Sequence, residues 1–225
     1  MFLSLLLSTL LTFVELNCEN LFDMRHDSLK NDMEFMPEGT YKWTPYRYWT
    51  KLNHIGQELI AQSEPLPDLV AMCEVENDTV MFDLTKRSLL REAGYEYVMT
   101  DSPDERGIDV ALMYQPASFL LLHSHSIRIR PLPDTRPTRD ILYAKGVVRS
   151  DDTLHVFVVH APSRRGGEEA SRPYRLHVAE QLAMAVDSVY ALQSAAKIVV
   201  AGDFNDYADS PALKLLYQHR LSNIS

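Results

Sequence analysis

The chain has 225 residues, of which 46% are hydrophobic and 24% charged, and its formal net charge is -9. These values predict one globular domain with one substantial core. The acidic balance argues against tight nonspecific binding to duplex DNA, which depends on neutralising many phosphates. The charge is uneven, because residues 128–175 hold ten Lys and Arg against six Asp and Glu. Such a stretch could face an anionic substrate, although solvated loop charges are the simpler interpretation.

The first eleven residues, MFLSLLLSTLL, are typical of the apolar core of a secretory signal, but they lack a basic start and a clear cleavage site. They are too short to span a bilayer, which needs roughly 20 apolar residues. We interpret residues 1–12 as the remnant of a signal peptide, with a first buried strand or helix as the alternative. We therefore favour export to the periplasm or the medium over a cytoplasmic location, and we expect no stable membrane span.

Strands and helices alternate along the chain. Apolar runs bounded by Pro, Gly and Asp predict strands at residues 13–19, 68–75, 95–99, 108–114, 119–129, 141–148, 154–160 and 197–202. Residues 20–45 are polar and are expected to form a long loop. Helices are expected at residues 48–63, 79–93 (ended by Gly94), 169–193 and 210–218, the last capped by Ser210. The pattern predicts an α/β fold, a four-layer sandwich of two mostly antiparallel sheets flanked by helices. Cys18 and Cys73 lie in strand-like runs and are expected to be buried thiols.

Polar residues follow four of the apolar strands, at the point where each strand ends. The four segments are Asn17–Asn20, Glu74–Asn77, His160–Gly167 and Gly202–Asp206. Each segment alone has an ordinary explanation, such as a solvated turn, a helix cap or a mobile basic loop. Together they combine Glu and Asn oxygens, which suit a hard cation such as Mg²⁺ or Mn²⁺, with the histidine and arginine that a phosphoryl group needs.

Five motifs carry a more specific pattern: NCENLFD, CEVEN, RGIDVALMY, HAPSRRGG and GDFND. In their order and rough spacing they resemble the endonuclease/exonuclease/phosphatase superfamily, which includes deoxyribonuclease I, abasic-site exonucleases, sphingomyelinases and inositol-phosphate 5-phosphatases. The resemblance runs from about Phe13 to the end of the chain. It implies a divalent-metal-dependent phosphoesterase in which Glu74 is the principal metal ligand, with Asn17 beside it and Glu19 at a position that is often acidic.

The resemblance also implies roles for the remaining polar residues. Asp203 would orient or deprotonate the attacking water, and Asn205 would fix the phosphate. His160 would bind a phosphoryl oxygen or assist proton transfer, and a protonated imidazole there would stabilise the negative charge of the transition state. The expected substrate-binding residues are Arg106, Asp109, Arg164 and Arg165.

Members of this superfamily normally continue beyond the GDFN segment with one or two strands and an Asp-His pair. This chain stops at Ser225, about twenty residues after GDFND. We therefore expect residues 13–225 to form a domain truncated at its C-terminus, lacking the last strands and impaired as an enzyme. The expected reaction is nuclease-like hydrolysis of a phosphodiester, with nucleic acid as one candidate partner, by a monomer. The alternatives are a non-catalytic phosphate-binding fragment, or a phosphatase or phospholipid phosphodiesterase on the same scaffold.

Overall fold

The computed structural model describes residues 10–62, 66–133 and 135–224, which form two four-stranded sheets. Most of the N-terminal segment interpreted as a signal remnant lies outside the described residues. The first sheet has the strand order β1 (Phe13–Leu21), β2 (Leu69–Val75), β4 (Asp109–Tyr114), β3 (Glu96–Met99). The second has the order β5 (Phe119–Ile127), β6 (Ile141–Val148), β7 (Thr153–His160), β8 (Lys197–Asp203). The helices are α1 (Pro45–Gln62), α2 (Asp78–Lys86), α3 (Glu168–Leu192) and α4 (Pro211–Tyr217).

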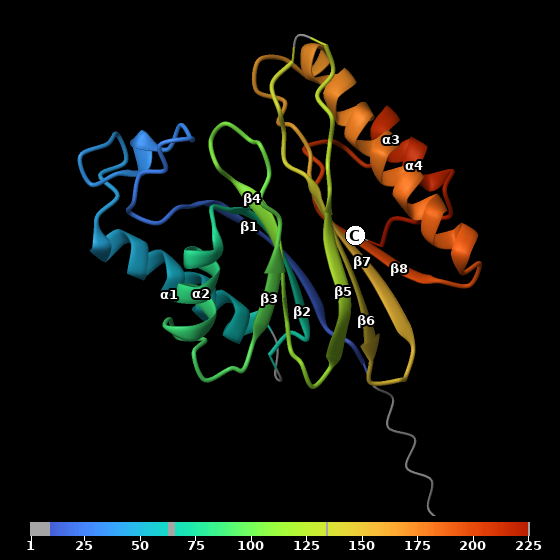
Figure 1. The fold of residues 1–225 in the computed structure, drawn as a ribbon, viewed down its shortest axis with the longest axis horizontal. Coiled ribbons are helices and arrows are strands. Elements are labelled where there is room, and N and C mark those ends of the chain that lie inside the picture. The colour runs from blue at the N-terminus through green and yellow to red at the C-terminus, as the bar shows by residue number, and fades with distance from the viewer. Residues whose placement is uncertain (1–9, 63–65, 134, 225) are drawn as a thin grey trace, which may run out of the picture.

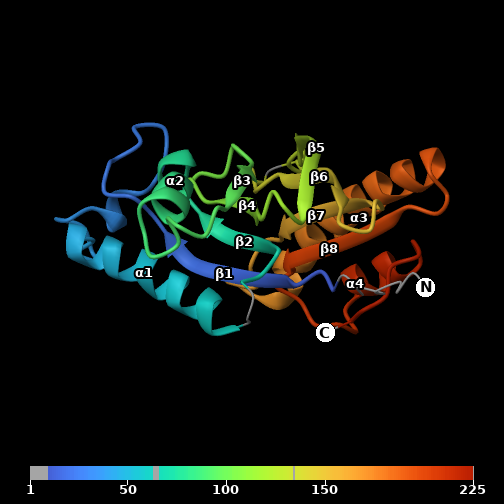
Figure 2. The same ribbon diagram turned by 90° about the horizontal axis from the view of Figure 1, so that it is seen from below.

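The two sheets pack face to face, with helices outside both. Helices α1 and α2 cover the outer face of the first sheet, and α3 and α4 cover the outer face of the second (Figure 1, Figure 2). All strand pairs are antiparallel except β1–β2 and β7–β8, which are parallel. The predicted four-layer α/β sandwich of two mostly antiparallel sheets is thereby confirmed.

The apolar core follows the period of two residues along each buried strand. On β2, Leu69, Ala71 and Cys73 face the second sheet, whereas Val70 and Met72 pack under α1 and α2. Cys18 belongs to the helix-side cluster, so it lies on the opposite face of the sheet from Cys73. Both cysteines are buried and free, as expected.

The helix expected at residues 79–93 is shorter than predicted, because α2 ends at Lys86. At Arg87 the backbone leaves the helical region with φ -130°, and the carbonyl of Asp83 accepts hydrogen bonds from both Arg87 N and Ser88 N. The chain then turns so that Leu90, only 1% exposed, packs beside Gly56 of α1. The apolar residues continue at helical spacing as far as Leu90, but the chain leaves the helix at Arg87 so that Leu90 can be buried against α1. Residues 22–44 form the expected loop, with one short 3₁₀ turn at Met33–Phe35.

Helix α4 begins as predicted. The Oγ atom of Ser210 accepts a hydrogen bond from the backbone N of Leu213 at 3.3 Å, and Pro211 occupies the first turn. Across the described residues, no helix combines the length and the apolar character needed to cross a bilayer.

Parallel pairing determines where the polar strand ends meet. Because parallel strands point the same way, Asn17 lies beside Cys73 in the β1–β2 pair, and His160 lies beside Asp203 in the β7–β8 pair. Strands β1 and β8 come from different sheets but contact each other. The four polar segments therefore converge at one end of the sandwich.

Candidate active site

Asp203 lies at the centre of the converging strand ends. It is the last residue of β8, and its Oδ2 atom accepts a hydrogen bond from Asn17 Nδ2 at 3.1 Å, across 186 residues of sequence. Its Oδ1 atom accepts a second hydrogen bond from the backbone N of Asn205 at 2.8 Å. Two donors from different segments thus fix the orientation of one carboxylate.

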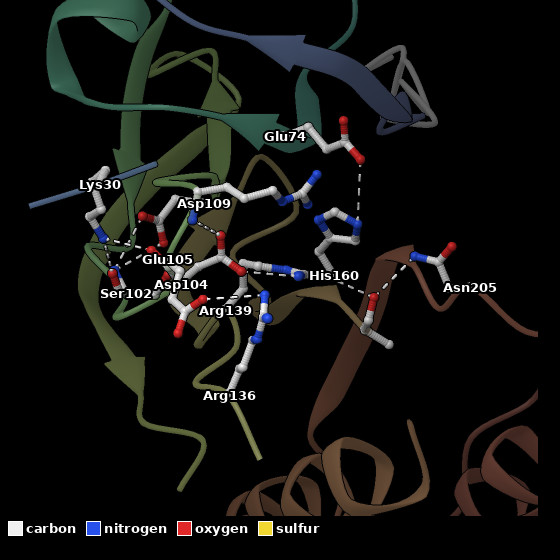
Figure 3. A network of polar contacts seen from close by, with 12 residues as sticks. Lys30, Glu74, Ser102, Asp104, Glu105, Asp109, Arg136, Arg139, His160 and Asn205 are labelled. Atoms are coloured by element: carbon white, nitrogen blue, oxygen red, sulfur yellow. Dashed lines mark hydrogen bonds and ion pairs between the residues drawn. The ribbon is translucent and has the colours of Figure 1, made fainter. Parts of the chain in front are cut away.

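Glu74 reaches the same centre through an irregularity of β2. Regular alternation would place its side chain with Val70 and Met72, under the helices. Instead, Glu74 has a left-handed backbone with φ 60°, and the register of β2 against β4 shifts between Cys73 and Val75. The Oε1 atom of Glu74 consequently lies 3.7 Å from Nε2 of His160 (Figure 3). A non-glycine residue in this conformation costs on the order of 1–3 kcal/mol, and such strain tends to occur at functional sites.

His160 is held in its neutral form. Its side chain is 2% exposed, and this burial, together with the nearby guanidinium groups of Arg139 and Arg106, lowers the pKa of the imidazole to about 2. Glu74 at 3.7 Å is too distant to offset these effects with a strong hydrogen bond. In the resting site the imidazole of His160 is therefore a neutral hydrogen-bonding group.

Arg139 is a buried cation of the site that sequence reasoning did not single out. Its Nη1 atom donates to Asp104 Oδ2 at 3.2 Å, and its Nη2 atom donates to the carbonyl of Ala161 at 2.8 Å (Figure 3). This arginine ties the loop between β3 and β4 to the residue that follows His160. In the sequence it is one of ten basic residues in a loop-rich stretch, and no spacing distinguishes it from the others.

Asn205 lies on the other side of the same carbonyl group. Its Nδ2 atom donates to the carbonyl of Ala161 at 3.0 Å, and its own backbone is left-handed with φ 50°. Just before it, Gly202 has φ +126°, and a Cβ atom there would lie 1.9 Å from the carbonyl oxygen of Val159. Only glycine therefore fits the turn that presents Asp203 and Asn205.

The structure does not bring two of the predicted site residues to this centre. Asp109 is 3% exposed, and its carboxylate accepts hydrogen bonds from the hydroxyl of Thr100 and the backbone N of Ser102, so it fastens the loop at residues 100–108. Glu19 is exposed, and its backbone carbonyl accepts a hydrogen bond from Lys51 Nζ at 2.5 Å. Within the described ranges, no contact joins the Glu19 carboxylate to Glu74 or Asp203.

The three predicted substrate-binding arginines differ in their surroundings. Arg106 is exposed and close enough to His160 to lower its pKa. Arg164 stacks over the ring of Tyr207 at 4.3 Å from the ring centre. Arg165 is exposed and lines the same cavity as Arg106.

The side chains at the centre fit a magnesium ion by their chemistry. Glu74, Asp203 and Asn17 offer carboxylate and amide oxygens, and Mg²⁺ usually takes only one or two protein carboxylates while keeping several waters. No group of three His, Cys, Asp or Glu side chains suited to a metal occurs in residues 10–62, 66–133 and 135–224.

Comparison with known proteins places this site in a family. The model of the Endonuclease/Exonuclease/phosphatase family matches residues 12–220. The chain belongs to this family. A search of curated proteins found no match.

Solved structures share the fold of this family member at low sequence identity. The human Nocturnin catalytic domain with bound sulfate is 20% identical over 81% of this chain, with a TM-score of 0.59. The mannosyl-6-phosphatase of Bacteroides thetaiotaomicron is 16% identical over 92% of this chain and 70% of its own, with a TM-score of 0.62. A humanized D. rerio TDP2 is 18% identical over 88% of this chain and 63% of its own, with a TM-score of 0.57. This chain spans 64% of the Nocturnin domain.

Proposed function

We propose that this family member hydrolyses phosphodiester bonds with the help of a divalent cation. The observation that carries the proposal is the convergence of the side chains of Asn17, Glu74, His160, Asp203 and Asn205 at one end of the sandwich. These residues come from four segments that lie far apart in the sequence. A constellation assembled from distant strand ends, two of whose residues have left-handed backbones, is typical of a catalytic centre.

Asp203 is the residue best placed to act on a water molecule. Hydrogen bonds from Asn17 Nδ2 and from the backbone N of Asn205 hold its carboxylate in one orientation. A fixed carboxylate of this kind can align a water molecule for attack and accept its proton. The amide of Asn17 would move with the carboxylate as one unit, so substitution of either residue should impair the same step.

His160 and the arginines provide the groups that stabilise negative charge. The neutral imidazole can donate one hydrogen bond to a phosphoryl oxygen without losing a proton. The guanidinium of Arg139 is engaged with Asp104 and Ala161, so it contributes a fixed positive field from behind the site. The exposed guanidinium of Arg106 is free to contact a phosphate directly.

Glu74 and Asn17 are the residues that we propose to hold Mg²⁺ or Mn²⁺, with Glu19, at the register shift of β1 between Asn17 and Leu21, as a more distant candidate. The cation would neutralise charge on the phosphate and lower the pKa of a bound water. Names of solved relatives illustrate the range of phosphate chemistry on this fold, since one is a mannosyl-6-phosphatase and another is TDP2 complexed with a single-strand DNA product. Our proposal for this chain is the diester.

The test is hydrolysis of bis(p-nitrophenyl) phosphate with Mg²⁺ or Mn²⁺. Activity should disappear with EDTA and return when Mn²⁺ is added back. Glu74→Gln should lower kcat/KM by about 10²–10³, because loss of one principal charged group at a preorganised site costs that much. The matched control is Glu58→Gln, which changes an exposed glutamate on α1. Equal inertness of wild type and Glu74→Gln, with retained binding of phosphate analogues, would instead identify a phosphate-binding module.

A further inference from the structure

A cavity of about 530 Å³ lies beside the candidate active site. Its walls are residues 104–106, 129–132 and 135–139, the segment that follows His160, and the first half of α3. The carbonyl of Ala161, next to His160, is bonded by Arg139, and Arg139 itself lines the cavity. The cavity therefore adjoins the catalytic centre through Arg106 and Arg139, although Asn17, Glu74, His160, Asp203 and Asn205 do not line it. Its volume falls within the 300–1,000 Å³ typical of sites for small molecules.

The cavity is strongly basic although the protein is acidic. Five arginines line it: Arg106, Arg130, Arg136, Arg139 and Arg165. Arg139 is paired with Asp104 at 3.2 Å, and Arg136 with Glu105 at 3.5 Å (Figure 3). Within the described part of the chain, the other three arginines have no carboxylate partner. In a chain of net charge -9, three arginines without a carboxylate partner in the lining of one cavity indicate an anionic ligand.

The rest of the lining is apolar and held in place. Ile129 and Val178 are buried in its floor, and Tyr174 contributes an aromatic ring. His177 Nε2 donates to the carbonyl of Arg130 at 2.9 Å, which fastens residues 129–132 to α3. Prolines at positions 131 and 137 restrict the backbone of the segments 129–132 and 135–139. A preformed wall of this kind lowers the ordering cost of binding.

We infer that this cavity binds a second anionic group of the substrate, so that the substrate is a compact molecule carrying two phosphates rather than a long nucleic-acid strand. This inference rests on the proposed function, because it takes the phosphate at Asp203 and Glu74 as the one that reacts. One phosphate would lie at the catalytic centre, within reach of Arg106. The other would enter the cavity between Arg130 and Arg165. The carbon skeleton between them would pack on Tyr174 and the prolines.

The test compares two probes by isothermal titration calorimetry in EDTA, where the proposed reaction does not run. The probes are adenosine 3′,5′-bisphosphate and adenosine 5′-monophosphate. The bisphosphate should bind about tenfold more tightly or better, because charge-assisted hydrogen bonds to phosphate are strong. Arg130→Gln and Arg165→Gln should each bring this ratio close to one. Arg91→Gln, at an exposed arginine in the turn before β3, should leave the ratio unchanged.

Equal affinities for the two probes in the wild type, or a ratio that neither variant changes, would overturn the inference. A strand-like substrate would be the better account if a twelve-residue oligo(dT) bound more tightly than the bisphosphate and lost affinity in Arg130→Gln. The two proposals fail separately, since the calorimetry needs no turnover. A chain that prefers the bisphosphate but never hydrolyses bis(p-nitrophenyl) phosphate would refute the proposed function and leave the anion site standing.

Discussion

Replacement of Arg139 with methionine should be among the most destabilising single changes near the site. The side chains of Arg139 and Asp104 are 7% and 8% exposed, so both charges lie away from water. Methionine keeps most of the volume but removes both guanidinium hydrogen bonds. The Asp104 carboxylate would then be left with the backbone N of Arg106 as its donor. Breaking one partner out of a buried ion pair typically costs about 3–5 kcal/mol.

Urea unfolding followed by the fluorescence of Trp43 and Trp49 measures this loss. A double-mutant cycle with Asp104→Asn isolates the pair, because the neutral amide no longer needs a cation. We expect Arg139→Met to lose about 3–5 kcal/mol alone and the double variant to lose less than the sum of the two single variants, by about 1–3 kcal/mol. A loss below about 1 kcal/mol for Arg139→Met, or strict additivity in the cycle, would refute the reasoning that this guanidinium compensates a buried charge.

Two further changes test the scaffold. Gly202→Ala should lower the free energy of unfolding in urea by about 3 kcal/mol or more, because the new Cβ would lie 1.9 Å from the Val159 carbonyl oxygen at φ +126°. The control Gly166→Ala, with φ +93° but open space, should cost only about 1 kcal/mol. Equal losses would show that the close approach of β7 and β8 does not exclude a side chain at position 202. Leu182→Ala should lower the free energy of unfolding by about 2–5 kcal/mol, because Leu182 is fully buried under the second sheet. The control Met184→Ala changes a side chain that is 64% exposed on the same helix, and it should alter the free energy of unfolding by no more than about 0.5 kcal/mol. A Leu182→Ala loss no larger than that of Met184→Ala would contradict this account of the core.

The layers of the fold could be predicted from local patterns because most elements repeat their hydrophobic period without interruption. The strand at Ile141–Val148 has the predicted bounds, and α3 differs by one residue at each end. The helix after Asn77 was predicted too long, since its apolar period continues to Leu90 while the backbone turns away at Arg87. A period in the sequence does not show that a side chain has left the helix to pack against a neighbour.

The sequence predicts which site residues lie close together where those residues end strands. It does not predict a property that depends on burial in the folded chain, such as the protonation of His160. Asn17, His160 and Asp203 meet because parallel pairing aligns their strand ends. The neutrality of His160 depends on its burial and on Arg139, a residue 21 positions away whose contacts only the folded chain reveals. Asp109 was assigned to the substrate from its motif, and the structure gives it a buried role in fastening a loop.

The most direct test of the central claim is the rate at which Asp203→Asn hydrolyses bis(p-nitrophenyl) phosphate in Mn²⁺. The variant keeps the shape of the side chain and one acceptor oxygen for Asn205 N, but it removes the acceptor for Asn17 Nδ2 and the charge that would accept a proton. We predict a fall in kcat of about 10²-fold or more, a loss of no more than about 1.5 kcal/mol in urea unfolding from the hydrogen bond to Asn17, and full activity in the control Asp209→Asn, an exposed residue nearby. Asp203→Asn activity within about threefold of the wild type would contradict a catalytic centre built around this carboxylate, since a positioned proton acceptor contributes roughly 10²–10⁴-fold.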